Sequence, residues 1–194
     1  MLTKRQKVGK RIFDLSLSIL LLPFVIIPLL LLLGIASLTT GKSGLFVQMR
    51  IGQFGSPFPL YKIRTLQGTS HRDVLDIKAS ETAFGSWLRK TKLDEIPQIF
   101  NVLKGEMSWV GPRPDVPGYA DMLTGNDRAM LTLKPGITGP ATLKYKNEEE
   151  ILLTRENPLH YNDTVIWPDK VRINLEYLEH WSLSKDVQYL IQSV

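Results

Sequence analysis

Hydrophobic residues are unevenly distributed along this chain, and their spacing predicts most of its elements. The longest apolar stretch covers residues 15–40, which hold no charged residue and predict a membrane helix. Residues 45–51 and 58–66 are short apolar runs on either side of a turn, and they predict two strands. In the second strand Lys62 and Arg64 are two residues apart, so we expect both on one face.

A helix with one apolar face is predicted after these strands. Its apolar positions repeat at helical spacing: Ile96, Ile99, Phe100 and Leu103. Gly105 ends the pattern, and Pro97 is tolerated only in a first turn. Asp94 and Glu95 are therefore expected at the helix N-terminus, where unpaired N–H groups favour a carboxylate cap and equally favour a bound phosphate. The pattern by itself favours the structural cap.

Three further segments are predicted to be helical: residues 81–90, 126–133 and 171–193. Residues 134–139 read as a tight turn, and residues 111–114 as a stiff one in which Arg113 lies between two prolines. A backbone fixed in this way suits bidentate binding of phosphate by a guanidinium. A rigid surface loop would explain the two prolines equally well. The expected fold is α/β and mostly helical, with a short β-hairpin.

Composition narrows the classes of function. Lysine and arginine number 24 against 19 acidic residues, giving a net charge of +5. That charge suits nucleic acid, anionic lipid or phosphorylated substrates, but nucleic-acid binding leaves the apolar stretch unexplained. Cysteine is absent, which excludes disulfides and a thiolate nucleophile. The three histidines, His71, His160 and His180, lie in no metal-ligand spacing, and surface positions are expected for them.

The apolar stretch predicts an anchor that enters and leaves the membrane on the same side. As one straight helix it would reach roughly 39 Å, enough to cross about 30 Å of hydrocarbon. Pro23 and Pro28 interrupt it near its middle, however, and basic residues flank both of its ends. Because the positive-inside rule places both flanks in the cytoplasm, a re-entrant helix-break-helix is preferred to a spanning helix.

Residues 93–114, LDEIPQIFNVLKGEMSWVGPRP, resemble a known family, the small monotopic phosphoglycosyl transferases, also called bacterial sugar transferases. Glu106 stands where that family commonly has Asp. Residues 62–65, KIRT, and 135–139, PGITG, match further family patterns, and the resemblance extends from Lys10 to about Asp186. Two departures are Ile27 before Pro28, where the family often has serine at the helix break, and residues 140–142.

This resemblance implies an enzyme that moves a sugar 1-phosphate from a UDP-sugar to a polyprenyl phosphate, the first membrane step of surface glycan assembly. It implies that Asp94 is the nucleophile and forms a covalent phosphosugar intermediate, and that Glu95 holds Mg²⁺. The four residues implied to offset phosphate charge are Lys62, Arg64, Arg89 and Arg113.

The implied organisation is a basic N-terminus and re-entrant anchor over residues 1–40, followed by a cytoplasmic-face catalytic domain over residues 41–194. The implied location is the cytoplasmic face of a bacterial inner membrane, with anionic lipid as a partner. A homodimer, the identity of the sugar and the glycan pathway are left open.

Two other functions remain. An aspartyl-nucleophile phosphatase would also use Asp94 but would release free phosphate. A non-catalytic basic membrane adaptor would use the acidic pair only for structure.

Overall fold

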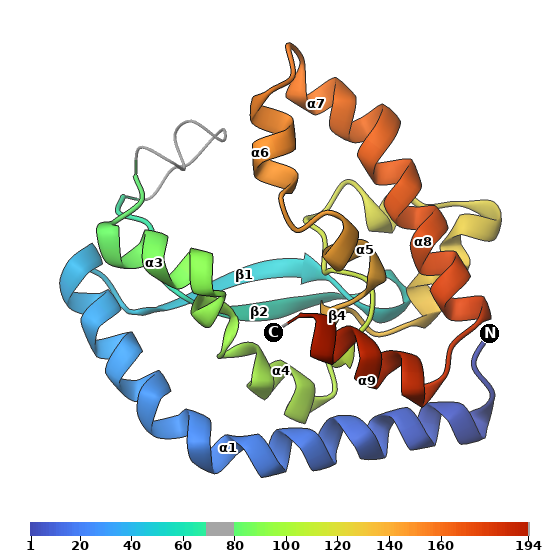
Figure 1. Cartoon of the computed structure of the whole chain (residues 1–194), viewed down its shortest axis with the longest axis horizontal. Coiled ribbons are helices and arrows are strands. Elements are labelled where there is room, and N and C mark those ends of the chain that lie inside the picture. The colour runs from blue at the N-terminus through green and yellow to red at the C-terminus, as the bar shows by residue number, and fades with distance from the viewer. Residues whose placement is uncertain (69–79, 194) are drawn as a thin grey trace. The chain divides into compact units, whose positions relative to one another are not determined.

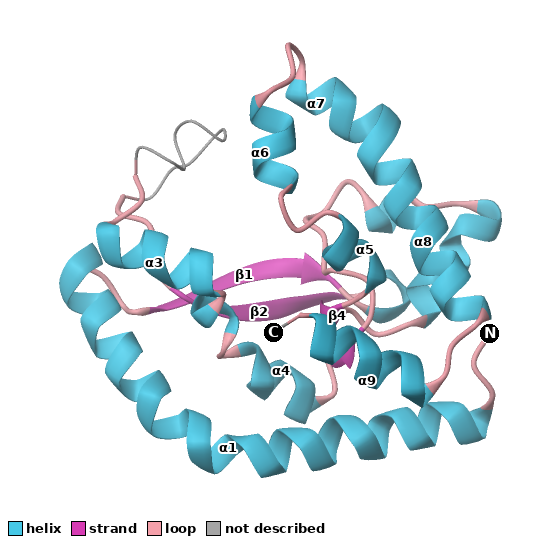
Figure 2. Cartoon of the chain, viewed as in Figure 1, coloured by secondary structure: helices cyan, strands magenta, loops and turns pink. Residues whose placement is uncertain are grey.

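The computed structural model describes residues 1–68 and 80–193, and its chain is mostly helical with two small sheets (Figure 2). The predicted mostly helical fold, its long apolar N-terminal helix and a two-stranded β1–β2 sheet are thereby confirmed, while the re-entrant break stays a prediction. Contacts divide the chain into two units. The first contains residues 1–14, 49–58 and 105–194, and the second contains residues 15–48 and 59–104. The two units are defined by contacts within the protein and not by contact with a membrane. Membrane immersion of residues 1–40 therefore stays a prediction.

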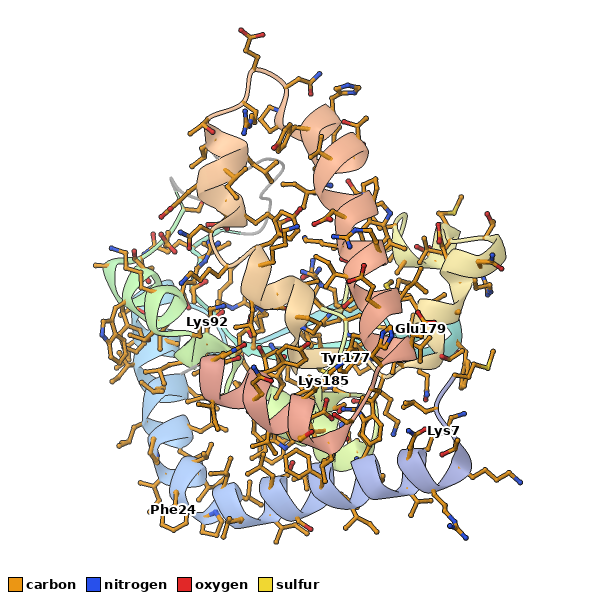
Figure 3. The ribbon with its side chains drawn as sticks, turned by 45° about the vertical axis from the view of Figure 1, so that its right-hand side comes forward. Lys7, Phe24, Lys92, Tyr177, Glu179 and Lys185 are labelled. Carbon is orange, nitrogen blue, oxygen red and sulfur yellow. The ribbon has the colours of Figure 1, made fainter. Side chains whose placement is uncertain are left out.

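The N-terminal helix α1 (Lys4–Thr40) contains both Pro23 and Pro28. It is helical throughout but changes direction within the second unit, and Phe24 lies at the corner (Figures 1 and 3). A proline removes one hydrogen bond and crowds the preceding turn, so a bend beside Pro23 has an identifiable cause. Of the described helices, α1 is the one long and apolar enough to cross a membrane, and its most apolar window is only 11% buried.

The second unit packs one face of α1 against a small core. Its other elements are most of β1 (Leu45–Ile51) and β2 (Pro57–Ile63), then α3 (Ala83–Thr91), the 3₁₀ turn η2 (Leu93–Glu95) and α4 (Gln98–Lys104). Leu29 and Ala36 of α1 are buried with Ile63 and Leu88. On the opposite face Leu30, Leu31 and Leu38 remain more than 60% exposed, which is the pattern of a helix with a lipid-facing side.

Besides the start of α1, the first unit contains a 3₁₀ turn and a parallel two-stranded sheet. The turn η1 (Gln53–Gly55) lies between β1 and β2, and β3 (Ser108–Val110) pairs with β4 (Gly136–Thr138). The sequence predicted a turn at residues 134–139, which is wrong because residues 136–138 form β4. Glycine allows this pairing: a Cβ on Gly136 would lie 2.1 Å from the backbone nitrogen of Gly111.

Helices and tight turns form the rest of the first unit. In chain order they are η3 (Ala120–Met122), η4 (Gly125–Thr132), α5 (Pro140–Lys144), α6 (Glu148–Leu153), α7 (Pro158–Tyr161), the π-helical η5 (Asn162–Ile166), α8 (Trp167–Glu179) and α9 (Leu183–Gln192). The helix predicted at 126–133 is a 3₁₀ helix. The helix predicted at 171–193 is interrupted between Glu179 and Leu183. Ser182 caps α9 there by accepting a hydrogen bond from the Lys185 N–H.

Candidate active site

The two predicted catalytic carboxylates lie in the tight turn η2. Helix α3 ends at Lys92, whose φ of 57° is in the left-handed region that usually favours glycine. A lysine held there costs on the order of 1 kcal/mol, and such strain is concentrated at functional positions. Two residues later the chain places Asp94 and Glu95 inside the second unit, with 7% and 8% of their surface exposed.

The predicted start of the following helix was wrong. Asp94 and Glu95 were expected at its N-terminus, but α4 begins at Gln98. The backbone N–H groups of Glu95 and Ile96 donate instead to the carbonyl oxygens of Lys92 and Leu93, three residues earlier. Because Pro97 has no N–H to donate, it separates this turn from the regular helix.

Lys62 contacts both carboxylates. It lies near the end of β2, and its Nζ is 2.9 Å from Oε1 of Glu95 and 3.7 Å from Oδ2 of Asp94. All three residues belong to the second unit. The structure therefore brings together three of the predicted site residues, although their positions in the sequence span 33 residues.

Arg64 and Arg89 have other partners in the same unit. Arg64 donates from Nε to the carbonyl oxygen of Ser43 at 2.8 Å, and its guanidinium lies 5.2 Å from the ring centre of Phe46. Arg89, in the last turn of α3, is 3.5 Å from Glu81. The sequence analysis did not single out Ser43 or Glu81, because nothing in their spacing links them to these arginines. Phosphate binding by Arg64 and Arg89 stays a prediction.

Arg113 belongs to the first unit, so its place beside Asp94 also stays a prediction. Its local backbone is fixed as expected, with buried prolines on both sides of an exposed arginine. The carbonyl oxygen of Pro112 accepts a hydrogen bond from the Gly136 N–H at 2.7 Å, and the Gly111 N–H donates to Thr138 at 2.9 Å. The parallel sheet thus holds the turn that carries this guanidinium.

The residues of η2 could supply part of the coordination shell of a magnesium ion. Mg²⁺ commonly takes one or two carboxylates and completes its shell with water and substrate phosphate oxygens. Asp94 and Glu95 supply two neighbouring carboxylates, and Lys62 contacts Oε1 of Glu95. In residues 1–68 and 80–193 no group of three or more His, Cys, Asp or Glu could hold a metal. A magnesium ion at this turn would therefore need oxygens from the substrate.

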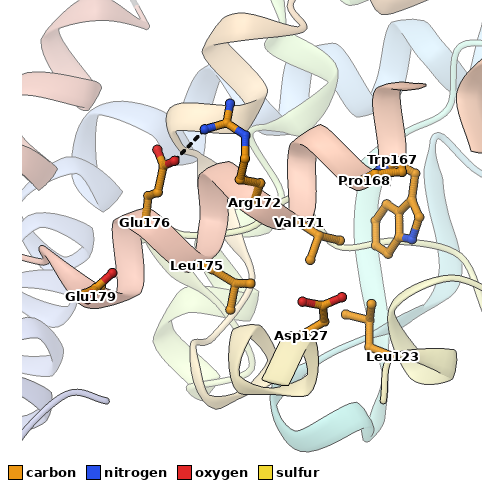
Figure 4. A pocket seen from close by; sticks show the side chains of 9 residues that line it. All are labelled: Leu123, Asp127, Trp167, Pro168, Val171, Arg172, Leu175, Glu176 and Glu179. Atoms are coloured by element: carbon orange, nitrogen blue, oxygen red, sulfur yellow. Dashed lines mark hydrogen bonds and ion pairs between the residues drawn. The ribbon is translucent and has the colours of Figure 1, made fainter. Parts of the chain in front are cut away.

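A separate pocket of about 390 Å³ lies in the first unit between α8 and η4 (Figure 4). Leu123, Trp167, Val171 and Leu175 give it an apolar base, while Arg172 pairs with Glu176 at its rim. None of the predicted site residues lines it. His160 and His180 are exposed, as expected, and His71 lies outside the described residues.

This chain is similar to known proteins both as a member of a family and in comparison with single relatives. Residues 5–194 match the family model described as bacterial sugar transferase. The sugar transferase EpsL of Bacillus subtilis is 34% identical over 95% of this chain and 85% of its own length. The undecaprenyl-phosphate galactose phosphotransferase of Salmonella typhimurium is 30% identical over 95% of this chain.

Coverage of the relatives varies. The chain spans 39% of the Salmonella protein, less than half of its length. A UDP-glucose:undecaprenyl-phosphate glucose-1-phosphate transferase of Caulobacter vibrioides is 30% identical over 95% of this chain and 68% of its own length. The similarity therefore covers nearly all of this chain, and several relatives contain additional sequence.

Proposed function

The chain belongs to the bacterial sugar transferase family, and from this premise we propose that it transfers a sugar 1-phosphate from a UDP-sugar to a polyprenyl phosphate. The Caulobacter relative is named for transfer of glucose 1-phosphate between UDP-glucose and undecaprenyl phosphate, and the Salmonella relative is named an undecaprenyl-phosphate galactose phosphotransferase. The family match favours a transferase over a phosphatase or a non-catalytic adaptor.

One observation carries the assignment of the site: Lys62 contacts two neighbouring, nearly buried carboxylates. A carboxylate is a competent nucleophile toward phosphorus, and a neighbouring ammonium offsets the charge of the phosphate it attacks. Asp94 is the proposed nucleophile. The longer of the two lysine contacts, 3.7 Å, is the one to Asp94, so the firmer ion pair is with Glu95.

The reaction would proceed in two displacements at one phosphorus atom. An oxygen of Asp94 attacks the phosphate that bears the sugar, the diphosphate bond breaks, and UMP leaves with the bonding electrons. An oxygen of polyprenyl phosphate then attacks the same phosphorus and breaks its bond to Asp94, which releases the polyprenyl diphosphate sugar and restores the carboxylate. Splitting the transfer lets a soluble donor and a lipid acceptor react in turn.

Glu95, together with the substrate's phosphate oxygens, would hold Mg²⁺. When bound, the ion would neutralise phosphate charge. Lys62 would keep the unliganded Glu95 paired and would orient the donor diphosphate. Arg64, Arg89 and Arg113 are proposed to bind phosphate oxygens as well, which would require Arg89 to exchange its contact with Glu81.

The test of the covalent route supplies the UDP-sugar without lipid. We expect UMP in an amount close to that of the enzyme and a sugar-phosphate adduct on Asp94 by mass analysis. Asp94→Asn should form neither, because a neutral amide is a poor nucleophile. A phosphatase would instead release free phosphate and make no polyprenyl product. Ternary-complex kinetics with an adduct-free enzyme would refute the route.

We further propose that α1 is a re-entrant anchor in a bacterial inner membrane, with the rest of the chain on the cytoplasmic face. Three observations support this: the bend at Phe24, the exposed apolar face of the helix, and the basic residues at both of its ends. Because the chain has no cysteine, single cysteines at Thr3 and Ser43 can be labelled selectively. Both should react from the same side of the membrane, whereas reaction from opposite sides would establish a spanning helix.

A further inference from the structure

Two cationic side chains converge on one glycine in the first unit. A Cβ placed on Gly105 would lie 3.3 Å from Nζ of Lys134 and 3.4 Å from Nη2 of Arg11. Gly105 has a φ of +88°, a conformation that favours glycine and leaves this space without a side chain. Arg11 and Lys134 are 123 positions apart in the sequence, so the fold alone pairs them.

Both cations are on well-anchored backbone. Arg11 lies between Lys10, which forms a 2.6 Å ion pair with Asp186, and Asp14, which accepts hydrogen bonds from Ser108 and Trp109. Lys134 lies between buried Leu133 and the Pro135 carbonyl that accepts from the Ser108 N–H at 2.9 Å. Side chains on fixed backbone need little reorganisation to bind a ligand.

The electrostatics at Lys134 are unfavourable without an anion. Burial lowers the pKa of Lys134 and the neighbouring Arg11 lowers it further, while Asp14 opposes both. Across residues 1–68 and 80–193 its ammonium makes no hydrogen bond or ion pair. Arg11 takes part in other interactions as well, and it contributes a fixed positive charge. An anion between the two would supply hydrogen-bond acceptors and remove the repulsion.

We propose that Arg11 and Lys134 bind a single phosphate group, either the headgroup phosphate of an anionic lipid or free inorganic phosphate. A guanidinium and an ammonium that face one space match the oxygens of a tetrahedral anion. Arg11 lies four residues, about one helical turn, before Leu15, where the uncharged stretch begins. That position suits the level of lipid headgroups. Phosphate binding by Arg11 and Lys134 does not depend on sugar-phosphate transfer, because the experiment measures binding and not turnover.

The experiment measures acylation of individual lysines in the full-length protein held in maltoside micelles, which contain no phosphate. Phosphatidylglycerol is then added to the micelles. A bound phosphate should raise the pKa of Lys134 by about one unit, which slows its acylation roughly tenfold. Exposed Lys7, which is on the same N-terminal segment (Figure 3), is the internal control for general effects of anionic lipid.

Two arms separate the sources of the phosphate, with sodium chloride at equal ionic strength as the reference. Protection by phosphatidylglycerol but not by excess inorganic phosphate identifies a lipid site. Protection by inorganic phosphate identifies a site for the free anion. If neither slows acylation of Lys134 relative to Lys7, the proposal is overturned.

Variants test the pairing of the two cations. Arg11→Gln should abolish the protection of Lys134, Arg11→Lys should keep most of it, and Lys7→Gln, which removes the same charge, should leave it intact. Thermal unfolding confirms that each variant is folded. Full protection of Lys134 in folded Arg11→Gln would overturn the two-cation site. If that variant does not fold, the phosphatidylglycerol and inorganic phosphate experiments on the wild-type protein test the proposal.

Discussion

The protein buries a carboxylate against a lysine in two places, and the two arrangements differ in how completely the carboxylate is enclosed. In the first unit Asp186 accepts hydrogen bonds from Lys10 at 2.6 Å, from the Tyr177 hydroxyl at 2.6 Å and from the Trp181 indole at 3.1 Å, and it is 0% exposed. In the second unit Asp94 and Glu95 share Lys62, and 10% of each side chain stays exposed.

The difference separates a closed ion pair from one that a substrate can reach, as the proposed nucleophile requires. Asp186 has donors on both oxygens and no exposed surface, so a substrate cannot reach it. Such a cluster restricts conformation, and breaking it leaves an uncompensated buried charge. Asp94 and Glu95 keep a solvent-facing edge through which a phosphate could reach them. Enclosure therefore distinguishes the two carboxylate sites, although both pair an aspartate with a lysine.

The largest expected effect is on turnover at the open site. Asp94→Asn should reduce sugar-phosphate transfer on the order of 10⁴-fold, because the nucleophile is lost. Its stability should change by only about 1 kcal/mol. Asp186→Asn is the matched isosteric control, and its folded fraction should retain activity. Equal losses of activity in the two variants would remove the distinction between the sites.

The next effect is on stability at the closed site. Lys10→Met leaves Asp186 buried without its cation and should lower the free energy of unfolding by about 3–5 kcal/mol, measured by denaturation in detergent. The double variant Lys10→Met/Asp186→Leu should recover much of that loss, because a buried pair can often be replaced by apolar groups. Lys7→Met is the control at an exposed lysine. A Lys10→Met protein as stable as this control would contradict the assignment.

A smaller effect is expected at the second carboxylate of the open site. Glu95→Gln should weaken the apparent affinity for Mg²⁺ roughly 10–100-fold, because a ligand is lost, while the protein stays folded. Turnover measured across a magnesium titration gives that affinity. Glu150→Gln, at an exposed position in α6, should leave the titration unchanged. Wild-type response to magnesium and chelator in Glu95→Gln would show that the metal binds elsewhere.

The smallest effect concerns a third carboxylate, Asp115, for which residues 1–68 and 80–193 supply no direct ion pair with a lysine. Burial raises its pKa to about 6, against the opposing charges of Lys170, Arg50 and Arg113, and Glu148 adds to the rise. A raised folded-state pKa means that the folded protein binds the proton more tightly, so stability increases as the pH falls from above 6.

Between pH 7.5 and 5, wild type should therefore gain about 1 kcal/mol relative to Asp115→Asn, which cannot titrate. Thermal unfolding of the two proteins at both pH values measures the difference. Parallel pH dependence would show that burial does not perturb this group.

How well the sequence predicted the molecule depends on the range of the interactions. The strand at Leu45–Ile51 was predicted with its bounds, and β2 was predicted within a few residues at each end, because alternation and turn residues are local signals. The β3–β4 sheet was missed. It joins two three-residue segments, Ser108 pairing with Gly136, and no periodicity survives in strands so short. The glycines at 111, 136 and 139 were the available signal of close backbone packing.

The site was predicted through resemblance more than through spacing. Local patterns led to Asp94 and Glu95 but placed the start of the regular helix there, whereas that helix begins only after Pro97, at Gln98. The contact of Lys62 with both carboxylates agrees with the residues singled out. The closed cluster around Asp186 could not be predicted, since Lys10 lies 176 positions away and no local pattern records such a distance.

That separation of Lys10 from Asp186 also orders events during synthesis. At about 5–20 residues per second, a ribosome reaches Asp186 roughly 9–35 s after Lys10. During this interval Lys10 lacks the Asp186 carboxylate that encloses it in the folded protein. The nascent chain therefore carries Lys10 as an additional cation beside the uncharged stretch, and the folded protein later buries it. Closure of the ion pair would then mark the point at which the C-terminal helix joins the completed fold.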